Sequence, residues 1–536
     1  MPERRPPSGV ETLGEALERK AAEIADKPFL RYGDERITYG ECDRRVNELA
    51  NGLETRGIGP GDTVCLFMYN SLEYVTLYFA LAKLGAVVAP IDTRFTGETL
   101  STALSMSGAE MVFVDERTRE TYEAVRGDVP DVAAEYFVGD RPEDHPYRPF
   151  RSLLGGEPTD APGGEHDGTD TASVTFVQRR ATEQPKGVLL PQFAYINTGW
   201  TVAKELFGYD GGDRIFTTLP LYSIFTFQLG VVGALFAGAE FVISDPFDPD
   251  TYWREVEACE ATIILYLGRM LSVLHNQHPG SGERSNPVEL AIGHGFGFGT
   301  DETLIREFEE RFGITVLEGY GITQTSTIAT YNTPEERRIG SSGKAVPYAD
   351  VEIVDEDDWP VDTGESGEIV IRPKRPNAMF KGYLSDPEGT VEVCRNQWIH
   401  SGDIGYKDED GFVYFIANED NSIYRGRIAG RVSSLEIEGV IDAAPNVRES
   451  AVVGVEDRSG TEEIKAIVVP EAGTELSPID VYRHCKRSLP YLKVPRYVDI
   501  RSEMPRNPTG KIRRTRLRED GIETAWDREA GYEFSR

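Results

Sequence analysis

The clearest chemical pattern lies near the C-terminus, where residues 505–514 have the spacing Pro-x-x-x-x-Gly-Lys-Ile-x-Arg and include Lys511. In a reaction between two anions, a cation at such a position stabilises the negative charge that builds as one attacks the other. The run Ser401-Gly-Asp403 adds a carboxylate, a group that accepts two hydroxyl hydrogen bonds well. By itself each run also fits an ordinary surface turn, so its meaning depends on the rest of the chain.

Further motifs occur in a recognisable order. They are Ile37-Thr-Tyr-Gly-Glu, Gly57-Ile-Gly-Pro-Gly-Asp62, Tyr78 to Pro90, Leu219-Pro-Leu221, Glu318-Gly-Tyr-Gly-Ile-Thr-Gln324, Gly364-Glu-Ser-Gly-Glu, Phe380-Lys-Gly-Tyr383 and Trp398 to Asp403. Over nearly the whole chain this order resembles the adenylate-forming superfamily, which contains acyl-CoA synthetases, peptide-synthetase adenylation domains and luciferases. The runs from Glu463 and from Lys493 are most similar to crotonobetaine/carnitine–CoA ligases.

The resemblance implies that the chain uses ATP, Mg²⁺, coenzyme A and a small-molecule carboxylic acid. Lys511 would contact the acid's carboxylate and the α-phosphate, and Asp403 would bind both ribose hydroxyls. Tyr320 would stack on adenine and Thr323 would touch phosphate. The remaining implied positions are Thr182, Lys186, Gly319 and Gly321 for the nucleotide, Tyr222, Ser223, Phe225 and Gly295 for the acid, Arg425 and Gly426 for the path of coenzyme A, and Gln324 for the metal.

The phosphate loop departs from the family pattern Thr-Ser-Gly-Thr-Thr-Gly-x-Pro-Lys-Gly. Thr182 and Pro185-Lys186-Gly187 are kept, but Arg180 and Glu183 occupy the two glycine positions. Those glycines would let backbone N–H groups curl around phosphates, and a glutamate there repels them. Arginine pairs with phosphate in bidentate fashion, so Arg179 and Arg180 are an alternative source of phosphate binding.

Other departures surround the same ligand. Gln324 replaces the glutamate that holds Mg²⁺ in the family, and an amide oxygen is a weaker ligand for a hard cation. Asn418 and Asn421 fall where the family has an arginine and the hinge aspartate, and Ser223 replaces a histidine. Two hypotheses follow: a ligase that acts through an acyl-adenylate in fatty acid or carnitine metabolism, or a catalytically degenerate relative that binds nucleotide, acyl ligand or a partner without turnover.

Apolar runs that alternate with helical patterns predict the architecture. Residues 64–68, 87–91 and 109–114 are expected as strands and residues 11–26 as a helix, which together indicate a parallel sheet covered on both faces. Beyond about residue 417 a smaller unit is predicted, with a helix at 436–442, strands at 449–455 and 463–469, a helix at 477–489 and a strand at 498–500. We therefore expect a large N-terminal α/β AMP-binding domain over residues 1–416 and a small mobile α+β lid over residues 417–536. Residues 139–170 are expected as a loop and residues 521–536 as a weakly ordered tail.

The composition indicates the setting. The chain has 90 Asp and Glu residues against 57 Lys and Arg residues, a net charge of −33. This negative charge disfavours nucleic acid and anionic membranes as partners. The acid is dispersed and lysine is scarce beside arginine, as in a halophilic surface; an ordinary acidic cytosolic protein is the alternative. Five cysteines without a Cys-x-x-Cys pair indicate neither a disulfide framework nor a zinc site.

Two features of the sequence bear on the location of the protein: its N-terminal residues and one uncharged stretch. Residues 1–7 lack the apolar core of a signal peptide, so a cytoplasmic protein is expected. Leu221 to Ala239 carries no charged side chain and has about the length of a membrane span. Its polar residues and three glycines favour a buried helix beside the active site. The sequence is also compatible with a homodimer.

Overall fold

The computed structural model describes residues 9–129, 132–140, 146–164, 166–177, 184–277, 286–294, 302–418, 422–424, 431–456, 462–506 and 512–528. The chain divides into two compact units. The first is made of Met1–His294, Asp301–Val351 and Ile371–Ile399, and the second of Gly295–Thr300, Glu352–Val370 and His400–Arg536. The domain boundary after residue 416 stays a prediction.

The first unit contains a nine-stranded sheet with the order β16-β15-β14-β13-β12-β10-β11-β1-β2. Its central pairs, from β14 to β1, are parallel, and the pairs at both edges are antiparallel. The strands are β1 (Pro28–Tyr32), β2 (Glu35–Thr38), β10 (Arg214–Thr217), β11 (Glu240–Ile243), β12 (Ile263–Leu267), β13 (Leu290–His294), β14 (Thr315–Tyr320), β15 (Thr330–Tyr331) and β16 (Lys344–Ala345).

A second sheet of the same unit has eight strands in the order β19-β9-β8-β4-β3-β5-β6-β7. The pairs from β8 to β7 are parallel, whereas β9 is antiparallel to both of its neighbours. The strands are β3 (Thr63–Phe67), β4 (Val87–Pro90), β5 (Met111–Val114), β6 (Ala134–Phe137), β7 (Arg148–Pro149), β8 (Thr171–Val177), β9 (Lys186–Pro191) and β19 (Gly382–Tyr383). The expected strands near residues 64, 87 and 109 and their parallel pairing are confirmed.

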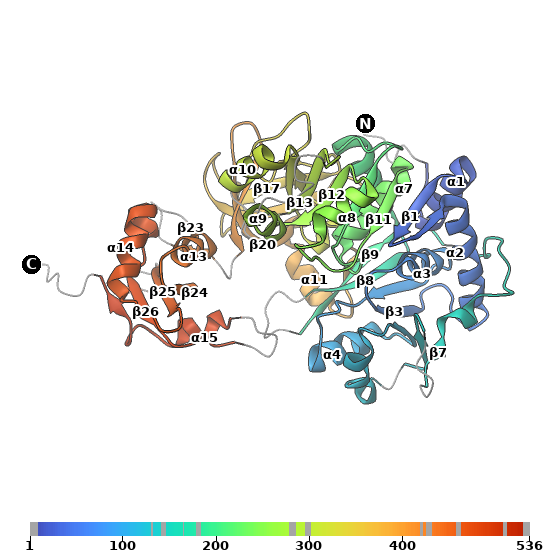
Figure 1. The fold of residues 1–536 in the computed structure, drawn as a ribbon, viewed down its shortest axis with the longest axis horizontal. Helices are drawn as coiled ribbons and strands as arrows, with labels where there is room; N and C mark the ends of the chain where they lie inside the picture. The colour runs from blue at the N-terminus through green and yellow to red at the C-terminus, as the bar shows by residue number, and fades with distance from the viewer. Residues whose placement is uncertain are drawn as a thin grey trace, which may run out of the picture. The chain divides into compact units, whose positions relative to one another are not determined.

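Helices pack on these sheets (Figure 1). The helices are α1 (Leu13–Ile24), α2 (Tyr39–Glu54), α3 (Leu72–Lys83), α4 (Gly97–Ser107), α5 (Arg119–Glu123), α6 (Gln192–Thr201), α7 (Gly233–Ala237), α8 (Tyr252–Cys259), α9 (Gly268–Asn276), α10 (Glu302–Phe312) and α11 (Pro387–Val393). Helix α1 begins where Thr12 and Glu15 form a capping box, which satisfies two backbone donors of its first turn. Strands such as β4 and β5 are buried along their whole length, as expected for a parallel sheet with both faces covered.

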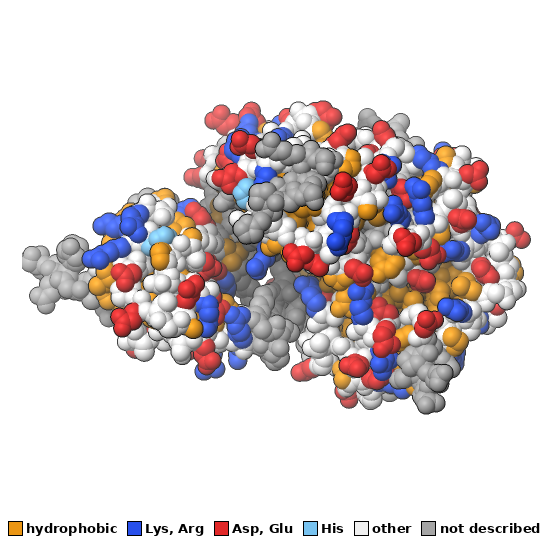
Figure 2. Space-filling view, in the orientation of Figure 1, with side chains coloured by type: hydrophobic (Ala, Val, Ile, Leu, Met, Phe, Trp, Pro, Cys, Tyr) orange, Lys and Arg blue, Asp and Glu red, His pale blue; other side chains and the backbone are white. Residues whose placement is uncertain are grey.

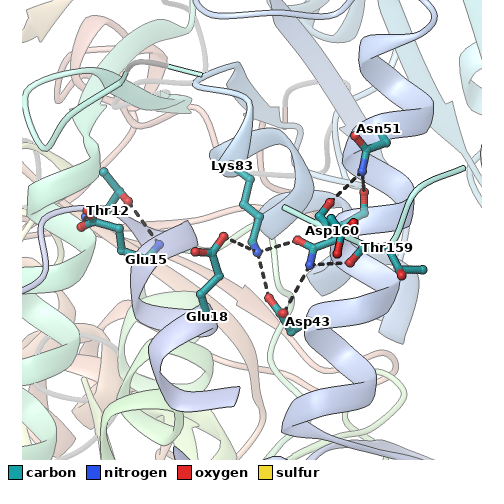
Figure 3. Close-up of polar contacts among 9 residues, drawn as sticks. Thr12, Glu15, Glu18, Asp43, Asn51, Lys83, Thr159 and Asp160 are labelled. Carbon is teal, nitrogen blue, oxygen red and sulfur yellow. Dashed lines mark hydrogen bonds and ion pairs between the residues drawn. The ribbon is translucent and has the colours of Figure 1, made fainter. Parts of the chain in front are cut away.

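Helices α1, α2 and α3 are joined by polar contacts around the buried Lys83 (Figure 3). The Lys83 ammonium donates to Glu18 at 2.7 Å, Asp43 at 2.8 Å and Asn47 at 2.6 Å. Its side chain is 2% exposed, so this cluster places a paired charge inside a helix layer. Asn51 lies one turn further along α2 and donates to the backbone carbonyls of residues 158 and 160. The predicted loop at 139–170 is thereby fastened to α2, and among its described residues only β7 and the short 3₁₀ helix Phe150–Leu153 are regular.

The uncharged stretch from Leu221 to Ala239 is buried within the first unit, as expected. Its middle part, Thr226–Val232, is a π-helix rather than an α-helix, and α7 follows it directly. Every residue of Thr226–Val232 is buried. Among the described residues, no helix is long and apolar enough to cross a membrane.

Two four-stranded sheets remain, with the orders β17-β18-β20-β21 and β24-β25-β26-β27; the second unit contains part of the first of them and all of the other. The strands are β17 (Ala349–Val354), β18 (Gly367–Pro373), β20 (Ile399–Lys407), β21 (Val413–Asn418), β24 (Val447–Glu456), β25 (Glu462–Pro470), β26 (Tyr497–Ile500) and β27 (Trp526–Asp527), and a separate hairpin is formed by β22 (Ser422–Tyr424) and β23 (Arg431–Ser433). Helices α13 (Ser434–Asp442), α14 (Pro478–Ser488) and α15 (Arg514–Glu519) lie against β24–β26 (Figure 1). The predicted helix–strand–strand–helix–strand order is confirmed.

The expectation of a weakly ordered tail from residue 521 is wrong for its first part. Trp526 and Asp527 form β27, which pairs antiparallel with β26. The Trp526 ring also lies 5.6 Å from the ring of Tyr482 on α14. A two-residue strand after a turn carries no hydrophobic period, so the sequence pattern could not reveal it.

Candidate active site

The altered phosphate loop joins β8 to β9 in the first unit. These strands form an antiparallel hairpin whose last described pair is Val177 with Lys186. The other edge of β9 pairs with β19, where Tyr383 lies opposite Val188. The Phe380-Lys-Gly-Tyr383 motif is therefore held beside the stem of the loop. Residues 178–183, which include the predicted nucleotide ligand Thr182, lie outside the described residues.

Lys186, at the end of this stem, is engaged by two groups. Its ammonium lies 3.2 Å from a carboxylate oxygen of Asp386 and 4.9 Å from the centre of the Tyr383 ring. Asp386 also caps α11 by accepting the Gly389 N–H at 2.8 Å. That hydrogen bond and then the Lys186 ammonium lower the pKa of Asp386. A phosphate at Lys186 would have to share this cation with Asp386.

The predicted adenine segment runs along the end of β14. Tyr320 is 7% exposed, and its backbone pairs with Thr330 of β15. A Cβ at Gly319 would lie 2.2 Å from the Tyr331 ring, and one at Gly321 would lie 2.2 Å from the Thr327 carbonyl oxygen. Both glycines are therefore required by close packing, which fixes the backbone on either side of Tyr320.

Thr323 begins a short 3₁₀ turn, Thr323–Thr325, which buries Gln324. The Gln324 side chain donates from Nε2 to the Tyr383 hydroxyl at 2.8 Å, and its backbone carbonyl accepts the Phe380 N–H at 3.0 Å. This geometry leaves the neutral amide oxygen as the atom that a cation would use. Among the described residues, no group of three or more His, Cys, Asp or Glu side chains is arranged to hold a metal ion.

Three of the predicted acid-pocket residues, Tyr222, Ser223 and Phe225, lie between β10 and the π-helix. Burial and then the nearby carboxylate of Asp92 raise the pKa of Tyr222. Ser223 closes the turn by donating its N–H to the Pro220 carbonyl at 3.1 Å. Phe225 packs with its ring centre 4.8 Å from that of His294 at the end of β13. The structure therefore brings the Phe225 turn and the end of β13 together.

His294 lies in the segment 293–299 that was expected to line the acid pocket, although the residue itself was not singled out. Its Nε2 atom is buried without a hydrogen-bond partner among the described residues, and burial lowers its pKa to about 4. Its ring also lies 5.7 Å from that of Tyr331, the residue that packs on Gly319. A neutral imidazole thus sits between the Phe225 turn and the adenine segment. Its position just before the Gly295 loop was the only sequence signal for it.

In the second unit, Asp403 lies on β20, opposite Asn418 of β21. The Ser401 hydroxyl, also on β20, accepts the Asp403 N–H at 3.0 Å and donates to the Ile369 carbonyl at 2.6 Å. Gly402 has a left-handed backbone, with φ of 67°, which explains the glycine between them. Hydrogen bonds within β20 and to β18 therefore fix the conformation of the Ser-Gly-Asp run.

Five predicted site residues lie outside the described residues: Thr182, Gly295, Arg425, Gly426 and Lys511. Of the rest, the structure brings Lys186 and Gln324 together through Tyr383, and it places Tyr320 on the strand that leads into the Gln324 turn. Tyr383 and Asp386 were not predicted as site residues. The motif that contains Tyr383 and the Asp-Pro start of α11 were the signals available for them.

Known proteins match both parts of the chain. Residues 17–384 match the family described as AMP-binding enzyme, and residues 436–511 match its C-terminal domain. A crotonobetaine/carnitine–CoA ligase of Escherichia coli O157:H7 is 32% identical over 490 residues, which cover 90% of this chain and 93% of the relative.

Solved structures show the same fold. An anthranilate–CoA ligase in complex with anthranoyl-AMP has a TM-score of 0.83 at 24% identity, covering 95% of this chain and 97% of its own. ATP-bound MatB from Rhodopseudomonas palustris has a TM-score of 0.78 at 25% identity, covering 95% of this chain and 99% of its own. These matches confirm the expected mixed α/β architecture with a large N-terminal and a small C-terminal part.

Proposed function

This chain belongs to the adenylate-forming family of AMP-binding enzymes, and we propose that it is an active ATP-dependent carboxylic acid–CoA ligase. One observation carries the proposal. In the predicted adenine segment, Gly319 and Gly321 pack where no side chain fits, on either side of the buried Tyr320.

In the proposed first step, a carboxylate oxygen attacks the α-phosphorus of ATP and pyrophosphate leaves. Lys511 stabilises the charge that builds between the two anions. Asp403 binds the ribose, and Tyr320 stacks on adenine between Gly319 and Gly321. Gln324 would offer an uncharged oxygen to Mg²⁺ bound with ATP, and the ion would supply positive charge beside the phosphates.

In the second step, the thiol sulfur of coenzyme A attacks the acyl carbon and AMP leaves. We propose that residues 417–536 act as a lid that turns between the two steps, a movement of the hinge type. Arg425 and Gly426 would then lie on the path of coenzyme A. The domain boundary at residue 416 and the roles of Arg425 and Gly426 are likewise proposals.

The phosphates are proposed to bind differently from the family pattern. Thr182 and Lys186 remain, but Lys186 shares its charge with Asp386 at 3.2 Å. Arg179 and Arg180 supply the missing positive charge, because guanidinium groups bind phosphate oxygens in bidentate fashion. The competing hypothesis is a degenerate relative that binds nucleotide without turnover, and the replacement of the metal-binding glutamate by Gln324 favours it.

For the acid, the relatives' names make crotonobetaine and carnitine the first candidates. We propose that the acid lies against Tyr222, Ser223, Phe225 and the Gly295 loop, next to His294. We also propose that the protein works in the cytoplasm at high salt. ATP and coenzyme A are proposed as its other partners.

The test measures three products at once. Purified chain in molar KCl is incubated with ATP, Mg²⁺, coenzyme A and a panel of acids, and thioester, AMP and pyrophosphate are quantified. A ligase forms the three in equal amounts with at least one acid. Lys511→Ala should abolish adenylation far more than thioester formation from supplied acyl-AMP, since the lysine acts on the first transition state. Equal losses in both half-reactions would refute its role.

A further inference from the structure

The residues just before Asp403 on β20 are bound by one carboxylate of β18. Glu368 Oε1 accepts the Gly402 N–H at 2.8 Å, and Glu368 Oε2 lies 2.9 Å from His400 Nδ1. A carboxylate can only accept hydrogen bonds, so Nδ1 carries a proton and donates it. Glu368 therefore bridges residues 400 and 402 of the same strand, on either side of Ser401.

The imidazole of His400 is buried between two carboxylates. Its side chain is 4% exposed, and its Nε2 atom lies 3.9 Å from a carboxylate oxygen of Asp358. That distance is too long for a hydrogen bond, so the contact with Glu368 sets the orientation of the ring. The ring in turn holds the Glu368 carboxylate, whose other oxygen is directed at the Gly402 N–H.

The backbone at Gly402 has a conformation that needs such support. Its φ of 67° is left-handed, and glycine enters and leaves that conformation easily because it has no Cβ. Side chains bind the next two N–H groups: Glu368 accepts that of Gly402, and the Ser401 hydroxyl accepts that of Asp403. A rotation at Gly402 would turn the backbone that carries the Asp403 carboxylate.

We propose that Glu368 and His400 are positioning residues for Asp403, and that together they hold the Gly402 backbone so that the carboxylate meets both ribose hydroxyls of the nucleotide. The inference rests on the proposed function for the role of Asp403. A carboxylate accepts two neighbouring hydroxyls only when both of its oxygens face them. Losing one hydrogen bond to a charged group costs on the order of tenfold in affinity. A nucleotide without ribose hydroxyls does not need this arrangement.

The same sheet provides a matched control. Glu352 of β17 lies 2.7 Å from the ammonium of Lys407, at the far end of β20. Its side chain is 35% exposed, and that of Glu368 is 18% exposed. Glu352→Leu therefore removes a carboxylate that binds β20 without touching residues 400–403.

The experiment measures the binding of ATP and of 2′,3′-dideoxy-ATP, each with Mg²⁺, by calorimetric titration in molar KCl. Glu368→Leu leaves two N–H donors without their acceptor, so its ATP affinity should fall about tenfold while its dideoxy-ATP affinity stays within about twofold. Glu368→Gln keeps an acceptor for the Gly402 N–H and can donate to the other tautomer of His400, so it should retain most of the ATP affinity. Glu352→Leu should match the unaltered chain.

A purely structural role for Glu368 would not distinguish nucleotides with and without ribose hydroxyls. Equal losses for both nucleotides, or an ATP affinity in Glu368→Leu equal to that in Glu352→Leu, would therefore overturn the proposal. If Glu368→Leu does not fold, His400→Leu makes the same comparison. It removes the group that holds the Glu368 carboxylate, so ATP should again lose affinity and dideoxy-ATP should not.

Hydrogen exchange without nucleotide separates this inference from the proposed function. The amides of Gly402 and Asp403 should exchange about tenfold faster in Glu368→Leu than in Glu352→Leu, because exchange follows local opening of the backbone. If the unaltered chain binds ATP and dideoxy-ATP equally well, the proposed role of Asp403 fails, and the exchange ratio still decides whether Glu368 holds this backbone. A ratio of one overturns it.

Discussion

Replacing Lys83 by methionine tests how the helix layer of the first unit is held together. The ammonium of Lys83 lies 2.6–2.8 Å from oxygens of Glu18, Asp43 and Asn47, and its side chain is 2% exposed (Figure 3). Methionine keeps most of the apolar stem, so the substitution removes the charge with little loss of packing. What remains is a set of acceptors that have lost their common donor.

The expected cost follows from how exposed those acceptors are. Breaking a buried ion pair by removing one partner costs about 3–5 kcal/mol of unfolding free energy. The side chains of Glu18 and Asp43 are 43% and 20% exposed, so water replaces part of what they lose. We therefore expect the lower end, about 3 kcal/mol, for Lys83→Met.

Urea unfolding in molar KCl, followed by fluorescence, measures this cost in the transition of the first unit. Lys20→Met is the control, since the Lys20–Glu23 pair on α1 is exposed and should contribute at most about 1 kcal/mol. Adding Asp43→Asn to Lys83→Met should recover part of the loss, because one uncompensated carboxylate disappears. If Lys83→Met unfolds at the same urea concentration as Lys20→Met, or if Asp43→Asn lowers stability further, the reasoning is refuted.

Three further predictions concern charge. The −33 net charge should make stability depend on salt, so thermal midpoints should rise from low salt to molar KCl, and a flat curve would contradict the halophilic interpretation; on the face shown in Figure 2, acidic and basic side chains lie interspersed over the surface. Burial lowers the pKa of His294 from 6.5 to about 4, so the unfolded chain binds a proton that the folded chain does not, and stability should fall by up to about 3 kcal/mol as the pH drops from 6.5 to 4. His294→Gln should flatten that part of the urea-midpoint curve, and an unchanged curve would show that the imidazole is not buried in its neutral form. Restoring Thr-Ser-Gly-Thr-Thr-Gly over residues 178–183 together with Gln324→Glu should strengthen Mg-ATP binding but not AMP binding in calorimetric titration, and equal gains for both nucleotides would contradict the assignment of the altered loop to the β- and γ-phosphates.

Local patterns in the sequence predicted those parts of the fold that depend on them. The buried run at Thr63–Phe67 and the alternation of strands with helices predicted a covered parallel sheet, and the structure pairs β3 with β4 and β5 in parallel. The π-helix at Thr226–Val232 could not be predicted in this way. Its period differs only slightly from that of an α-helix, and the polar residues and glycines of this segment obscure so small a difference. Strand β27 is also set by a partner, Val498 of β26, rather than by its own two residues.

The candidate site shows the same division. Motif resemblance identified Gln324 and Lys186 as positions of interest, and the replacement of the family's glutamate by Gln324 was readable from residue type alone. Their common partner Tyr383 and the counter-charge of Asp386 depend on the pairing of β9 with β19, whose residues are far apart in the sequence. His294 was not singled out within the expected pocket segment 293–299, because its role depends on the packing of Phe225 against the end of β13.

The measurement that tests the central claim most directly is acid-dependent exchange of pyrophosphate into ATP, in molar KCl, over a panel of carboxylic acids that includes crotonobetaine and carnitine. An active ligase with an altered phosphate loop should show exchange with at least one acid, none without acid, and none in Lys511→Ala. If no acid in the panel supports exchange, and calorimetry shows that the chain binds ATP and AMP equally well, the account is contradicted. The chain would then be a nucleotide-binding relative without turnover.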